Sequence, residues 1–199
     1  MTDGIDRTDR TFCSVFELLV TAYHEGGHAV GALLVSPALP LEYATIVPRD
    51  HDNGHVSIED WTDLLIPDID DDDCDGPCEH ERMYLEAETL MTFLGGLVEG
   101  RFRSGDLTTW VPAGFAFDGA CIIETGERLC ADELGTGPFA AHGYGRAWMQ
   151  SMCSRAIALT ERQPHFWHAV GLVAAALMRE KTLSGADVEA LVKAAHGRA

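Results

Sequence analysis

The chain has 199 residues, and its 14 Lys and Arg against 32 Asp and Glu give a formal net charge of −18 at pH 7. With 46% hydrophobic residues, a chain of this length can bury one continuous core, which predicts a single domain over residues 1–199. The negative charge repels phosphate backbones and anionic lipid surfaces, so it argues against nucleic-acid and membrane binding. No apolar run is long enough to span a bilayer, the N-terminus lacks the pattern of a secretory signal, and the scattered cysteines favour reduced thiols. We therefore expect a cytoplasmic protein.

The spacing of apolar residues predicts a mainly helical fold with one small β-hairpin. Apolar positions recur every three or four residues over 14–35, which is typical of an amphipathic helix. Residues 43–47 and 55–59 then predict two strands around an Asn53-Gly54 turn. Helical spacing returns in five later segments. These are 82–103, 118–133, 148–159, 166–177 and a last helix that Ser184 and Asp187 open as a capping box.

The first predicted helix carries the residues that point to chemistry, His24-Glu25-Gly26-Gly27-His28. Four residues advance a helix by about 400°, so both imidazoles project from one face and can bind one metal ion. Neutral imidazole suits Zn²⁺, and Glu25 is then the candidate general base that accepts a proton from an attacking water. The structural alternative is a helix with two incidental histidines.

Two glycines inside that helix favour the functional interpretation. Each Gly in a helix interior costs about 1 kcal/mol relative to Ala. Gly26 and Gly27 are therefore a poor choice for an ordinary helix. Small residues at these positions would allow another backbone or a substrate to approach closely.

Several segments together resemble the peptidase domain of the FtsH-type zinc metalloproteases. The run from Thr21 to Val30 is similar to the zinc-site helix of that family, which usually has Ala at the position of Gly26. Weaker similarities follow in the same order along the chain. They are Ala44 to Arg49, Leu94-Gly95-Gly96 with Glu99, Leu172 to Leu177, and Thr182 to Gly185 with Val188. The resemblance implies a compact, helical, zincin-like metallopeptidase domain.

A catalytic zinc ion needs three protein ligands and an open position, so one ligand is missing from the helix motif. The resemblance implies that an Asp at the start of a later helix supplies it, and Asp118 occupies the matching place. Glu99 is the alternative, either as the ligand or as a hydrogen-bond partner of His24 or His28. A plain helix N-cap is the structural alternative for Asp118.

An acidic stretch separates the predicted hairpin from the second helix. Like charges packed this closely cannot share a core, so residues 68–81 predict a solvated loop. Relative to the family, residues 62–81 resemble an insertion, which could cover the active site or exclude acidic peptides. Cys74, Cys78 and His80 have the spacing of a partial metal site, but no second pair completes it. We interpret the two cysteines as free thiols.

The function we expect is a zinc-dependent metalloendopeptidase that acts on unfolded or flexible polypeptides. The alternatives are a non-catalytic regulatory protein that keeps the metal, and an enzyme for a non-peptide amide. The FtsH family couples this domain to an ATPase and a membrane anchor, and we expect this chain to lack both. A separate ATPase partner would then have to deliver folded substrates, and the oligomeric state stays open. The resemblance also implies that an extended peptide adds to an exposed strand edge at residues 46–48 or 56–58.

Overall fold

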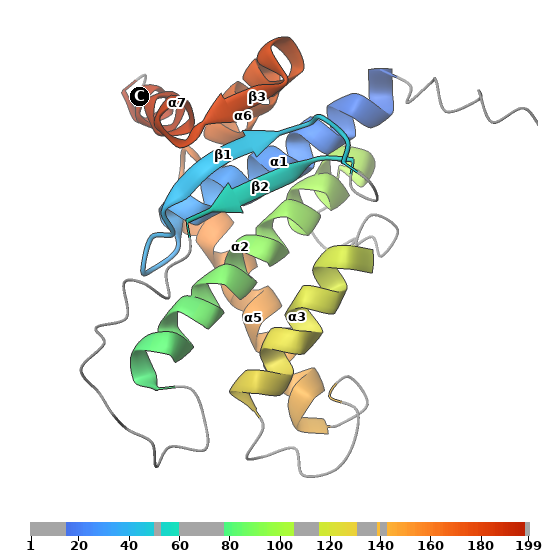
Figure 1. The fold of residues 1–199 in the computed structure, drawn as a ribbon, viewed down its shortest axis with the longest axis vertical. Helices are drawn as coiled ribbons and strands as arrows, with labels where there is room; N and C mark the ends of the chain where they lie inside the picture. The colour runs from blue at the N-terminus through green and yellow to red at the C-terminus, as the bar shows by residue number, and fades with distance from the viewer. Residues whose placement is uncertain are drawn as a thin grey trace, which may run out of the picture.

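The computed structural model describes residues 15–49, 53–59, 78–105, 116–130, 139 and 143–197. Over these residues the fold is mainly α-helical with a small antiparallel sheet, as the sequence predicts (Figure 1). Within the described ranges, no helix combines the length and the apolar character needed to cross a membrane. The helices are α1 (Val15–Leu34), α2 (Glu79–Ser104), α3 (Ala116–Leu129), α5 (Gly143–Arg162), α6 (Phe166–Glu180) and α7 (Gly185–His196).

Several predicted boundaries need correction. The second helix begins at Glu79 rather than residue 82, because the Cys78 sulfur accepts a hydrogen bond from the Glu81 backbone N–H and caps it. The predicted acidic loop therefore ends earlier than residue 81, and most of it, with Cys74, lies outside the described residues. The helix predicted over 118–133 begins two residues earlier and ends at Leu129.

The sheet has one more strand than the sequence predicts. Its order is β2 (His55–Ile58), β1 (Leu41–Thr45) and β3 (Thr182–Ser184), so β1 is central (Figure 1). The β1–β2 pair is the predicted hairpin, and β3 pairs with β1 through Tyr43 opposite Ser184. A three-residue strand is too short to show an alternating pattern, and β3 leads directly into the capping box that opens α7.

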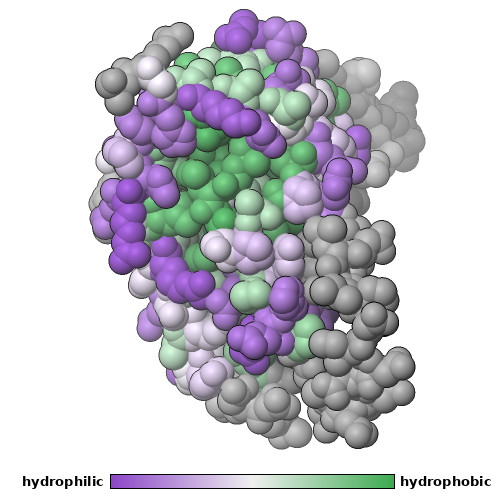
Figure 2. Space-filling model, turned by 90° about the vertical axis from the view of Figure 1, so that its left-hand side faces the viewer, coloured by the Kyte–Doolittle hydropathy of each residue, from purple (hydrophilic) through white to green (hydrophobic). Residues whose placement is uncertain are grey.

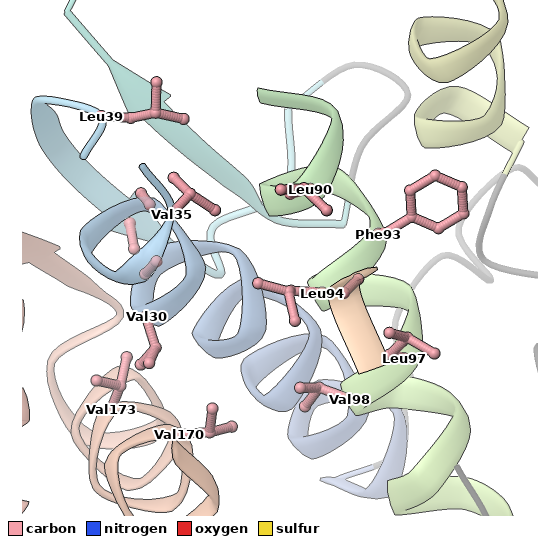
Figure 3. Close-up of a cluster of buried hydrophobic side chains, with 14 of the residues drawn as sticks. Val30, Val35, Leu39, Leu90, Phe93, Leu94, Leu97, Val98, Val170 and Val173 are labelled. Atoms are coloured by element: carbon pink, nitrogen blue, oxygen red, sulfur yellow. The ribbon is translucent and has the colours of Figure 1, made fainter. Parts of the chain in front are cut away.

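Helix α1 lies at the centre of the core, between α2 and α6 and beneath the sheet (Figure 1). Every residue from Glu25 to Ala32 is buried. Figure 3 shows Val30 directed toward α6, and Leu94 of α2 beside the opposite face of α1. Burial of a Val or Leu side chain stabilises a protein by about 1.5–3 kcal/mol. This packing therefore holds α1, the helix that carries His24 and His28, in one place.

Apolar residues also reach the surface on one side of the molecule. The face in Figure 2 is the left-hand side of Figure 1, and α3 lies at the right of Figure 1. Hydrophobic residues gather at the centre of this face, and hydrophilic residues surround them (Figure 2). This apolar patch lies on the side of the molecule away from α3.

Candidate metal centre

The two histidines of α1 converge as their spacing predicts. Their ring centroids lie 4.5 Å apart with an interplanar angle of 84°, and the two Nε2 atoms are 2.9 Å apart. Both rings are largely buried, with 12% of the His24 side chain and 8% of the His28 side chain exposed. One turn of helix therefore presents two imidazole nitrogens to a single point.

Asp118 of α3 meets the histidines at this point. Its Oδ2 atom lies 3.1 Å from Nε2 of His24 and 3.4 Å from Nε2 of His28. Ligand atoms of the three residues all lie within 4.8 Å of one another. Oδ2 is buried, and no described residue gives it a well-formed hydrogen bond. A bound cation would satisfy this oxygen, and two imidazoles with one carboxylate suit a zinc ion that keeps an open position.

The other nitrogen of each imidazole is held by a hydrogen-bond acceptor. Nδ1 of His24 lies 2.9 Å from Oε2 of Glu99, and Nδ1 of His28 lies 3.0 Å from the backbone carbonyl of Met91. Because these acceptors require a proton on Nδ1, Nε2 of each ring is the atom left to bind a metal. Both acceptors come from α2, so the packing of α1 against α2 orients the pair.

Of the two carboxylates that the sequence offers as third ligand, the geometry favours Asp118. Glu99 contacts His24 on the Nδ1 side, away from the point where the Nε2 atoms meet. Its other oxygen, Oε1, accepts a hydrogen bond from Arg103 Nε at 2.7 Å. Glu99 is therefore placed as a hydrogen-bond partner of His24, the second of the two roles expected for it. Arg103 and the Met91 carbonyl were not predicted, because only the packed helices bring them to the site.

Glycines permit the close approach of the two helices. A Cβ atom on Gly27 would lie 2.8 Å from the Leu94 carbonyl oxygen, and one on Gly95 would lie 2.2 Å from Cε1 of His28. Either side chain would separate α1 from α2. Gly26 faces α6 instead, where a Cβ would meet the Val170 oxygen at an ordinary 3.4 Å. The predicted close approach is therefore confirmed for Gly27, whereas Gly26 leaves room for alanine.

Glu25, the candidate base, is buried next to the hairpin. Only 5% of the residue is exposed. A Cβ on Gly54, just before β2, would lie 2.6 Å from Oε1 of Glu25. The predicted turn residue Gly54 thus also lets the backbone pass over the Glu25 carboxylate. Nothing in the local sequence indicates this contact, because it joins α1 to the hairpin.

The carboxylates around His24 control its protonation when no metal is bound. Burial lowers the pKa of the His24 imidazole, but the contacts with Asp118 and Glu99 and the nearby Glu25 outweigh it and raise the pKa to about 10. Burial also raises the pKa of the Asp118 carboxyl, but His28 and His24 outweigh it and hold that pKa well below its usual range. Without a metal, protonated His24 and ionised Asp118 therefore form an ion pair.

Metal binding should release this proton. At pH 7.5 we expect about one proton per zinc from His24, and the apparent zinc affinity should fall up to about tenfold per pH unit as pH decreases. The pKa of His24 rises from a reference of 6.5 to about 10 on folding. Its contribution to metal-free stability is thus full below pH 6.5 and is lost as pH rises toward 10. Titration calorimetry in buffers of different ionisation enthalpy measures the release, and zinc binding without it would contradict this assignment.

Two isosteric substitutions should separate the roles of the carboxylates. Asp118→Asn removes the charge of the candidate third ligand and should weaken zinc binding more than 100-fold, whereas loss of a group that orients a ligand costs about 10- to 100-fold. Glu99→Gln should fall in the smaller range. Competition with a chromophoric chelator measures both affinities. The reverse order would make Glu99 the third ligand.

Cys78 and His80, from the predicted partial metal site, lie at the start of α2. Cys78 is exposed, carries a free thiol and caps the helix through its sulfur. His80 is exposed in the first turn. Cys74 lies outside the described residues, so the second site stays a prediction.

The geometry defines a helical protein with a candidate zinc centre, and the sequence comparisons point to the same class. The chain is 51% identical over 39 residues to the ATP-dependent zinc metalloprotease YME1L1 of Mus musculus and of Rattus norvegicus. The human (Homo sapiens) protein of that name matches equally over 39 residues. The match covers 20% of this chain and 6% of the rodent proteins, so the chain spans only a small share of their length. No protein-family model matches the chain.

Proposed function

We propose that this chain is a zinc-dependent metalloendopeptidase that hydrolyses peptide bonds in unfolded or flexible polypeptides. One observation carries the proposal: Nε2 of His24, Nε2 of His28 and Oδ2 of Asp118 meet at one buried point. Glu25 follows the first of these histidines directly in the chain. The short similarity to a zinc metalloprotease supports the same class.

Each residue of the site has a separate task. His24, His28 and Asp118 would hold the zinc ion, and Glu99 and the Met91 carbonyl would fix the imidazole orientations. A zinc ion held there supplies Lewis acidity, which acidifies water and polarises a carbonyl group. Glu25 would accept a proton from the attacking water and pass it to the leaving amine. A purely structural metal site has no need of a buried carboxylate in this position.

The backbone donors of residues 46–48 are not available for the predicted peptide edge. The Ile46 N–H donates to the Lys181 carbonyl, and the Val47 N–H donates to the Thr45 hydroxyl. Pro48 has no N–H group. These three residues therefore offer no free N–H group to an added peptide.

Strand β2 is the edge that could receive an extended peptide. It pairs with β1 and lies at the end of the sheet order, so Val56 to Ile58 are the remaining candidates. Gly54, which lies over Glu25, comes directly before this strand. A peptide added to β2 would thus pass close to the proposed base. Recognition of this kind reads backbone more than side chains and suits unfolded substrates.

The test measures metal content and cleavage together. We expect the purified protein to bind one equivalent of zinc and to cleave casein without ATP, with chelator abolishing cleavage and added zinc restoring it. A tightly folded protein should resist, because delivering it would need a separate ATPase partner. One equivalent of zinc with no cleavage of casein or of a peptide library would contradict the peptidase proposal and favour a regulatory metal protein.

A cytoplasmic location is part of the proposal, and the free thiols of Cys78, Cys121, Cys130 and Cys153 support it.

A further inference from the structure

Arg103 lies one helical turn after Glu99 on α2 and contacts carboxylates of two helices. Its Nε donates to Oε1 of Glu99 at 2.7 Å. Its Nη2 donates to Oε2 of Glu17 on α1 at 2.9 Å, and Nη1 lies 3.5 Å from the other Glu17 oxygen. The planar guanidinium therefore spans α1 and α2 beside the metal centre, in a fork that only arginine offers.

Glu99 links Arg103 to His24, one of the proposed metal ligands. Glu99 uses Oε1 for Arg103 and Oε2 for Nδ1 of His24. Glu99 is buried, with 7% of the residue exposed. Its carboxylate cannot rotate without losing one of these two bonds, so the guanidinium fixes the plane that Glu99 presents to His24. Buried carboxylates of this kind are stable only when paired and hydrogen-bonded.

We propose that Arg103 is a positioning residue of the metal centre, acting through Glu99 to hold Nε2 of His24 toward Asp118. The inference rests on the proposed zinc site. It does not rest on the stability of the outer ion pair, because Arg103 and Glu17 are 31% and 45% exposed and pairs at the surface contribute little. Loss of the guanidinium should thus affect metal binding far more than folding.

The chain offers a matched control on the same helix. Arg101 lies two residues before Arg103 but points to α6, where its guanidinium lies 3.9 Å from the Trp167 ring centroid. Arg101→Gln removes the same charge from the same end of α2 without touching Glu99. It removes the Trp167 contact and should leave zinc affinity unchanged within about twofold.

The experiment compares zinc affinity, by chelator competition, in the wild type, Arg103→Gln, Arg103→Lys and Arg101→Gln. We expect Arg103→Gln to weaken zinc binding about 10- to 100-fold, as removal of groups that orient metal ligands does. Arg103→Lys keeps a charge that can reach Glu99, so it should recover part of the loss. If Arg103→Gln does not fold, the zinc affinity of Arg103→Lys is compared with that of the wild type instead.

A double substitution tests the route through Glu99. If Arg103 acts through that carboxylate, Arg103→Gln combined with Glu99→Gln should bind zinc as weakly as Glu99→Gln alone, and no more weakly. The visible absorption bands of the Co²⁺-loaded protein should change in the same variants. Additive losses, or wild-type zinc affinity in both Arg103 variants, would overturn the inference. A wild-type protein that binds no zinc would instead refute the metal site itself, so the two failures are distinguishable.

Discussion

Glu25→Gln should reduce peptide cleavage by about 10²- to 10⁴-fold, the range that general acid–base catalysis contributes. The amide has the shape of the carboxylate but cannot accept a proton from water. Because Glu25 is not one of the three converging ligands, the variant should still bind one zinc. Cleavage of casein and of a fluorogenic peptide measures the loss, and metal analysis of the same sample measures the zinc.

The contrast with a ligand variant makes this result specific. Asp118→Asn should lose zinc and activity together, whereas Glu25→Gln should lose activity and keep zinc. Circular dichroism of both proteins checks that the helices are intact. If Glu25→Gln retains wild-type cleavage, the base lies elsewhere, and the interpretation of the helix motif as catalytic is wrong.

Gly27→Ala should destabilise the protein by about 2 kcal/mol. A methyl group at this position would lie 2.8 Å from the Leu94 carbonyl oxygen and 3.0 Å from the Gly95 Cα, both backbone atoms that cannot move aside. Overpacking costs about 1–3 kcal/mol, here at the upper end, and alanine recovers about 1 kcal/mol of helix propensity. Chemical denaturation of the metal-free protein measures the difference.

The neighbouring glycine supplies the control for this prediction. Gly26→Ala makes the same chemical change one residue earlier, but its methyl group would meet α6 at 3.4 Å or more. We expect it to be neutral or to stabilise the protein by up to about 1 kcal/mol through helix propensity. Equal effects of the two substitutions would show that α1 does not pack against α2 as described. Zinc affinity should also fall in Gly27→Ala only, because α2 carries Glu99 and the Met91 carbonyl.

The parts of the site that lie on one helix could be predicted from the sequence. His24 and His28 share a face because of a four-residue spacing, and that spacing is local information. Asp118 could be proposed only from the resemblance to a family. The residues around it do not indicate a contact with His28, which lies 90 residues earlier in the chain. In the fold, its Oδ2 atom lies 3.1 Å from Nε2 of His24 and 3.4 Å from Nε2 of His28.

The features that could not be predicted from the sequence depend on tertiary packing. Arg103 resembles any basic residue near a helix C-terminus, and its contact with Glu99 matters only because Glu99 faces His24. Gly54 resembles a turn glycine until the hairpin packs over Glu25. Strand β3 forms because β1 offers it a free edge, not because three residues have strong strand propensity. Each of these features is set by a neighbour distant in the chain.

Anomalous diffraction at the zinc edge from crystals of the zinc-loaded protein tests most directly whether His24, His28 and Asp118 bind zinc. We expect one strong peak about 2.0–2.1 Å from Nε2 of both His24 and His28, and about 2.0–2.2 Å from an Asp118 carboxylate oxygen. Glu99 should remain on Nδ1 of His24. A peak bound by Glu99 in place of Asp118, or no peak between the two histidines, would contradict the proposed zinc site.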